Sequence, residues 1–108
     1  MTRTVPVRAP LNEKVLRALS DPLRMRIVQL LAVEQLCTSH LVELTGAAQT
    51  NISNHLRALR EAGLVTNEPC GRYSYHRLNP DRLAALGEQL TALAAAAQGL
   101  DTRKKPCG

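Results

Sequence analysis

The residues from 49 to 63 carry two kinds of side chain at helical spacing. Ile52, Leu56 and Leu59 repeat at intervals of four and three residues, which predicts a helix with one buried face. The opposite face carries amides, hydroxyls and guanidinium groups: Gln49, Thr50, Asn51, Ser53, Asn54, Arg57 and Arg60. Short amides near the start of a helix match the hydrogen-bonding edge of adenine, and arginines pair with phosphate oxygens. We therefore expect this face to contact double-stranded DNA; the alternative is a helix face that only meets solvent.

Three shorter helices must position that face. Residues 11–33 predict two of them, the second with Asp21 as its N-cap. A third helix is expected to be capped by Thr38 or Ser39 and to end at Gly46. Only a few residues separate that glycine from the helix with the polar face. Two helices joined by so short a turn predict a helix-turn-helix.

A β-hairpin is expected directly after the polar helix. Two β-prone runs, 64–68 and 73–78, flank a turn that contains proline and glycine. Arg72 and Arg77 belong to this hairpin. We expect both side chains to lie along the DNA backbone and to contribute salt-sensitive affinity.

A last helix is predicted from residue 80 to residue 98. Its leucines repeat at intervals of three, four and three residues: Leu83, Leu86, Leu90 and Leu93. A stripe of this kind is typical of packing between helices. We expect it to pair two subunits in a homodimer.

The length and charge of the chain limit the functional classes. With 108 residues, we expect one domain at 11–98, a flexible N-terminal arm at 1–10 and a flexible tail at 99–108. The net charge of +5 is compatible with a polyanionic partner. There is no paired acid and base, no glycine-rich phosphate loop and no nucleophile motif, so an enzyme is not expected. The absence of an apolar run or a secretory signal predicts a cytoplasmic protein with no membrane partner.

Two segments in register resemble a known family. Residues 18–27 read ALSDPLRMRI, similar to the opening of the ArsR/SmtB repressors, and residues 51–56, NISNHL, resemble their recognition helix. Residues 71–75, GRYSY, resemble their wing. The resemblance covers roughly residues 11–98. It implies a mainly α winged helix-turn-helix with about five helices and one hairpin, acting as a homodimeric repressor of a dyad-symmetric operator. Ala48 departs from the family, which often has a serine cap there.

Three cysteines, Cys37, Cys70 and Cys107, are the candidate inducer ligands. Thiolates bind soft ions such as As(III), Sb(III) or Cd(II), and three sulfurs suit trigonal arsenic. Residues 36–41, LCTSHL, resemble the family's arsenic-site segment, with Cys37 on its first cysteine. Ser39 replaces the second cysteine and His40 replaces the acid. The preferred hypothesis is an As(III) or Sb(III) sensor that uses Cys37 and Cys107, with Cys70 as the least certain ligand.

Several alternatives stay open. Cys37 can be a small buried side chain, and Cys70, at the expected wing tip, can be an exposed bystander far from Cys37. The thiols can instead form a redox or persulfide switch, or a Cd(II) site. A zinc or nickel site is not expected, because residues 80–98 contain no histidine. A protein-interaction adaptor is the remaining class, and it leaves the polar helix face unexplained.

Overall fold

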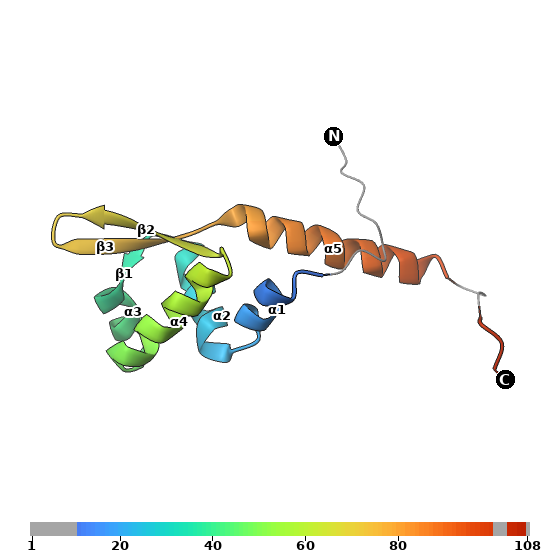
Figure 1. Cartoon of the computed structure of the whole chain (residues 1–108), viewed down its shortest axis with the longest axis horizontal. Coiled ribbons are helices and arrows are strands. Elements are labelled where there is room, and N and C mark those ends of the chain that lie inside the picture. The colour runs from blue at the N-terminus through green and yellow to red at the C-terminus, as the bar shows by residue number, and fades with distance from the viewer. Residues whose placement is uncertain (1–10, 101–103, 108) are drawn as a thin grey trace.

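A computed structural model describes residues 11–100 and 104–107 of the chain. Its helices and strands follow in the order α1 (Glu13–Leu19), α2 (Pro22–Leu31), β1 (Leu36–Cys37), α3 (Thr38–Thr45), α4 (Gln49–Glu61), β2 (Val65–Cys70), β3 (Tyr73–Leu78) and α5 (Pro80–Gln98). Five helices and a β-hairpin form the expected winged helix-turn-helix (Figure 1). The arm predicted at 1–10, and residues 101–103 and 108 of the predicted tail, lie outside the described residues.

The first two helices begin at side-chain caps. Asn12 accepts the amide of Val15, so α1 begins two residues later than the start of the apolar pattern. Asp21 accepts the amides of Leu23 and Arg24 at 2.9 and 3.1 Å, as expected for an N-cap. These hydrogen bonds, together with the charge of His55, lower the pKa of Asp21 below its ordinary value.

The core lies between α1, α2, α3 and α4. Its largest fully buried side chains are Val15, Ile27, Leu41, Ile52, Leu56, Leu59 and Leu64. The stripe predicted on α4 is therefore the face that docks this helix onto the others. At the end of α4, Gly63 adopts a φ of 77°, which turns the chain into β2.

The sheet has three strands in the order β1-β3-β2, all antiparallel. β3 pairs with β2 through the hairpin and with β1 through Leu36↔His76 and Cys37↔Tyr75. β1 was not expected from the sequence. The prediction that Thr38 or Ser39 caps α3 was wrong, because β1 runs directly into the helix. Cys37, the last extended residue at φ −85° and ψ 170°, is the N-cap of α3. Thr38 is the first helical residue, and its hydroxyl bonds to His76 instead.

Only the first half of α5 packs against the domain. The amide of Asn79 donates to the carbonyl of Leu64 at 2.8 Å, and its side chain donates to the carbonyl of Gly63 at 3.0 Å, which fixes the start of the helix. Leu86 is buried and Leu83 is partly buried against the core. The rest of α5 projects away from the wing (Figure 1).

This projection makes the molecule long. Its radius of gyration is 17.9 Å, whereas a compact domain of 108 residues has about 13 Å. The described helices include none that is both long and apolar enough to cross a membrane. Because it projects beyond the domain, the distal half of α5 lies outside the core of its own subunit.

Candidate nucleic-acid interface and thiol site

The polar face of α4 lies on the surface. Its exposed members are Gln49, Thr50, Asn51, Ser53, Asn54 and Arg57, whereas Arg60 is half-buried. The helix begins after Ala48, which supplies no side-chain cap. The amide groups of its first turn are thus available to an anion such as a phosphate. This arrangement presents short amides, hydroxyls and helix-end N–H groups on one face.

His55 helps to fix the orientation of α4. Its Nε2 atom lies 3.9 Å from Oδ1 of Asp21, the cap of α2, and its side chain is half-buried. The contact ties the middle of α4 to the beginning of α2. His55 therefore packs between these two helices.

The wing carries two further cations. Arg72 and Arg77 are both exposed. Arg72 lines a hollow of about 230 Å³ that it shares with Cys37, Thr38, Ser39, Gln49, Tyr73 and Ser74. The hollow therefore joins the first residue of α4, the start of α3 and the wing tip.

Cys37 lies at the inner wall of that hollow. Its side chain is only 6% exposed. The sulfur lies 3.0 Å from the hydroxyl of Ser39 and 3.2 Å from Nδ1 of His40, and that same Nδ1 accepts the amide of Cys37 at 3.2 Å. The hydroxyl of Ser39, and then the amides at the start of α3, lower the pKa of the Cys37 thiol below its ordinary value, although burial opposes them. The Ser39 hydroxyl and the helix N-terminus thus stabilise the thiolate form of Cys37 relative to that of an ordinary cysteine.

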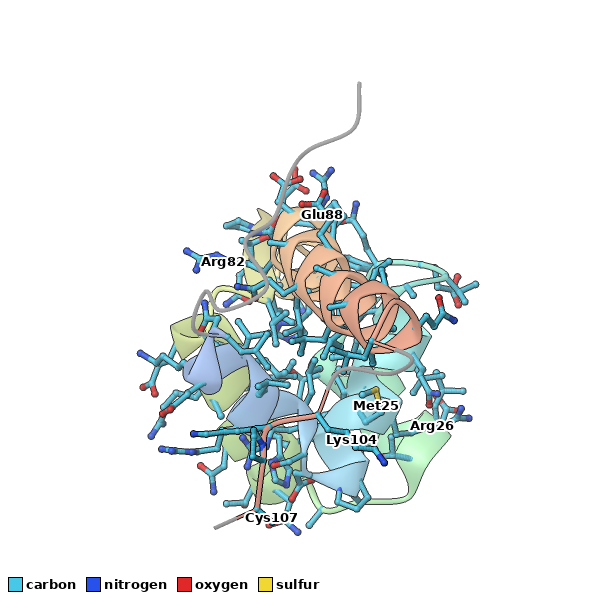
Figure 2. All side chains as sticks on the ribbon, turned by 90° about the vertical axis from the view of Figure 1, so that its right-hand side faces the viewer. Met25, Arg26, Arg82, Glu88, Lys104 and Cys107 are labelled. Atoms are coloured by element: carbon cyan, nitrogen blue, oxygen red, sulfur yellow. The ribbon has the colours of Figure 1, made fainter. Side chains whose placement is uncertain are left out.

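The other two cysteines do not join Cys37. Cys70 and Cys107 are both exposed. With strands about 4.8 Å apart and a rise of about 3.3 Å per residue, the register separates the Cα atoms of Cys37 and Cys70 by roughly 12 Å. Cys107 lies at the end of the molecule opposite the wing, toward the viewer in Figure 2. Among residues 11–100 and 104–107, no three His, Cys, Asp or Glu side chains gather closely enough to hold a metal ion.

Two histidines have roles that the sequence interpretation missed. His40 contacts the Cys37 thiol, and its ring lies 6.2 Å from that of Tyr75. The sequence signal that could have indicated this role is the position of His40 three residues after the cap of α3, where a side chain can reach back to the cap. His76 is buried between β1 and β2, and the available signal was its place on the same strand face as Leu78.

The four leucines of α5 divide into two pairs. Leu83 and Leu86 pack on the core of their own subunit. Leu90 and Leu93 are 45% and 40% exposed. The exposed pair is the part of the predicted stripe that is free to contact a second subunit.

Relatives of known class share most of this chain. Residues 21–67, which include α2, α3 and α4, match the family of bacterial regulatory proteins named arsR. The arsenical resistance operon repressor of Staphylococcus xylosus is 30% identical over 94 residues, which cover 87% of this chain and 90% of that protein. The chain belongs to the ArsR family. It is a member of a transcriptional regulator family and not an enzyme.

Further relatives place this ArsR-family protein among repressors with different names. The transcriptional repressor SmtB of Mycobacterium tuberculosis is 41% identical over 71 residues, covering 66% of this chain; the match spans 53%, about half, of that protein's length. A crystal structure described as a possible transcriptional regulator for arsenical resistance is 35% identical, with a TM-score of 0.66 over 82% of this chain and 96% of that one. The winged helix-turn-helix is therefore a fold that this ArsR-family chain shares with its solved relatives.

Proposed function

We propose that this protein is a transcriptional repressor that binds a dyad-symmetric DNA operator as a homodimer. The observation that carries the proposal is the exposed polar face of α4, which lies beside the arginine-bearing wing. In this arrangement Gln49, Asn51 and Asn54 read base edges in the major groove. Arg57, Arg60, Arg72 and Arg77 hold the phosphates on either side.

The homodimer forms through α5. Within the described part of the chain, the leucines of its distal half stay exposed, and the helix projects well beyond the domain. Apolar side chains on one face of a projecting helix are stabilised when a second copy covers them. A two-fold axis through this contact presents two copies of α4 to two half-sites.

The inducer is a thiophilic ion, As(III) or Sb(III), and Cys37 is its first ligand. A lowered thiol pKa favours binding, because the thiolate is the form that bonds to the ion. Each As–S bond made by arsenous acid consumes one thiolate and one proton and releases one water molecule. Cys107 is the second ligand and Cys70 the least certain third. Since Cys70 lies roughly 12 Å from Cys37 within one subunit, a complete site requires the tail segment or the partner subunit to approach. Relatives named arsenical resistance operon repressors support this choice of ion.

The position of Cys37 gives the ion a direct route to the interface. Its hollow is shared with Gln49 of α4 and Arg72 of the wing. A ligand on the sulfur competes with its contacts to the Ser39 hydroxyl and to Nδ1 of His40 and displaces the start of α3. DNA and inducer then weaken each other's binding by the same factor.

A second candidate keeps the DNA binding and changes the signal. The lowered pKa of the Cys37 thiol favours its reaction with an oxidant, or with a sulfane-sulfur donor that converts it to a persulfide. A disulfide with Cys70 is disfavoured, because it requires Cα atoms within about 7 Å. A Cd(II) site is the third candidate and differs from the first in its metal alone.

A gel-shift panel tests the proposal. Duplex DNA from upstream of the protein's own gene is bound under reductant and challenged with arsenite, antimonite, Cd(II), Zn(II) and peroxide. We expect arsenite and antimonite to release the DNA from the native chain and from Cys70→Ser, but not from Cys37→Ser or Cys107→Ser. Release by peroxide alone supports the redox switch instead. Unchanged release by arsenite from the Cys37/Cys107 double variant refutes the proposed ligands, and no DNA binding at low salt refutes the repressor.

A further inference from the structure

The buried ring of His76 links the start of α3, beside Cys37, to the β2–β3 hairpin. The residue is 3% exposed and lies in β3, the central strand of the sheet. Its Nε2 atom lies 3.0 Å from the hydroxyl of Thr38, and its Nδ1 atom lies 2.9 Å from Oδ1 of Asn67. Thr38 follows Cys37 directly and opens α3, whereas Asn67 belongs to β2. One ring therefore spans three structural elements.

The proton positions in this chain of hydrogen bonds follow from the partners. Oδ1 of Asn67 can only accept, so Nδ1 of His76 carries the hydrogen and donates it. Nε2 then has a lone pair and accepts the hydroxyl hydrogen of Thr38. Burial, and next the charge of Arg60, lower the pKa of His76 below its ordinary value and keep the ring neutral. The neutral ring satisfies both hydrogen bonds with one fixed tautomer.

A ligand on the Cys37 sulfur cannot leave this chain of hydrogen bonds undisturbed. The Cys37 side chain is nearly covered, and its sulfur already contacts Ser39 and His40. β1 has only two residues, and both pair with β3, one of them directly with His76. A shift of Cys37 therefore moves Thr38, its neighbour, relative to the ring. The ring would then lose a partner in a buried environment, which is unfavourable unless β3 moves as well.

We propose that the hydrogen-bond chain Thr38–His76–Asn67 transmits the state of the Cys37 thiol to the wing, with His76 as its positioning residue. This inference rests on the proposed function, since the wing has to contact DNA for the transmission to matter. The hydrogen-bond chain reaches Asn67 in β2, the strand on the other side of β3 from β1, and β2 leads into the turn that carries Arg72. Movement at the thiol thus alters the wing without passing through α4.

A double-variant cycle tests the hydrogen-bond chain without any inducer. Cys37→Met places a larger thioether at the thiol position, and Asn67→Ala removes the far end of the hydrogen-bond chain. Thr66→Ala is the matched control, because Thr66 is the exposed neighbour of Asn67 on β2. We expect Cys37→Met to lower DNA affinity about tenfold in the native chain and in Thr66→Ala, but less than about twofold in Asn67→Ala. Equal effects in all three backgrounds overturn the proposal.

A second readout covers variants that fold poorly or bind no DNA. The double-variant cycle is repeated with Cys37→Ala in place of Cys37→Met, because Cys37→Ala removes the sulfur contacts without adding bulk. The ring nitrogen signals of His76, followed by nuclear magnetic resonance, should change on Cys37→Met, which adds bulk at the thiol position, and report the loss of the Thr38 bond. Unchanged His76 signals overturn the proposal even where DNA binding cannot be measured.

The arsenite response separates this inference from the proposed inducer. The ratio of DNA affinities without and with arsenite is taken within each variant, so that changes in basal affinity cancel. We expect a ratio at least about fivefold smaller in Thr38→Val than in the native chain, and a native ratio in Thr38→Ser, which keeps the hydroxyl. A native ratio in Thr38→Val counts against the hydrogen-bond chain. If arsenite leaves the native protein on DNA while the double-variant cycle is non-additive, the inducer is wrong and the hydrogen-bond chain is supported.

Discussion

Replacement of Arg72 by alanine tests how the wing contributes to DNA binding. Arg72 is exposed at the wing tip. In the proposed homodimer on DNA, the substitution would remove two phosphate contacts, one from each copy. Each contact contributes about 0.9 to the slope of log affinity against log salt concentration, so the slope should become shallower by about 1.8. At about 0.15 M salt the same two contacts are worth about 1.5 log units. We therefore expect DNA affinity to fall about 30-fold there, or about 2 kcal/mol.

The assay is fluorescence anisotropy of a labelled operator duplex at several salt concentrations. Arg17→Ala is the matched control, because it removes the same charge from an exposed position on α1, where Arg17 lies 4.0 Å from Glu13. The control isolates the contact from the general loss of positive charge. If Arg72→Ala changes the slope no more than Arg17→Ala does, the wing does not hold phosphates as argued.

Three further substitutions address the core, the subunit contact and the buried histidine. Leu86→Ala should lower the free energy of unfolding by about 2–5 kcal/mol in urea denaturation, because Leu86 is 6% exposed; a loss below about 1 kcal/mol contradicts the docking of α5. Leu90→Lys should shift sedimentation from dimer to monomer, while Val33→Lys, at a position 84% exposed, should not; a stable Leu90→Lys dimer places the subunit contact elsewhere. Burial lowers the pKa of His76, so the unfolded chain takes up a proton first as pH falls below about 6.5. Stability should therefore drop as pH falls through about 6.5, and His76→Gln should flatten that drop in urea denaturation; an unchanged slope shows that His76 does not supply it.

The helix-turn-helix could be predicted because its signals are strong and local. Ile52, Leu56 and Leu59 form a regular stripe, and glycines end both helices at 46 and 63. The hairpin follows from two β-prone runs around a turn. Because the stripe repeats regularly along α4, it also predicts that the opposite, polar face of this helix lies on the surface.

The surroundings of the thiol could not be predicted in the same way. β1 contains only Leu36 and Cys37, too short for a recognisable alternation, and it exists because β3 offers a partner. Cysteine is not among the residues that usually cap helices, so Thr38 and Ser39 were the natural choices. The bond between Thr38 and His76 joins residues 38 positions apart, and such a contact depends on tertiary packing alone.

Because the molecule is long, a small rotation at the projecting half of α5 moves the distant wing by several ångströms. The chain extends 61 Å along its longest axis, with the wing at one end and the distal half of α5 toward the other. A rigid-body rotation of about 5°, around an axis that passes through one end and is perpendicular to this length, displaces the other end by about 5 Å. A small change in the angle between two subunits is thus comparable with the width of the DNA minor groove, about 6 Å. In the proposed homodimer, a small change in the angle between the two subunits therefore moves both wings out of register with their half-sites.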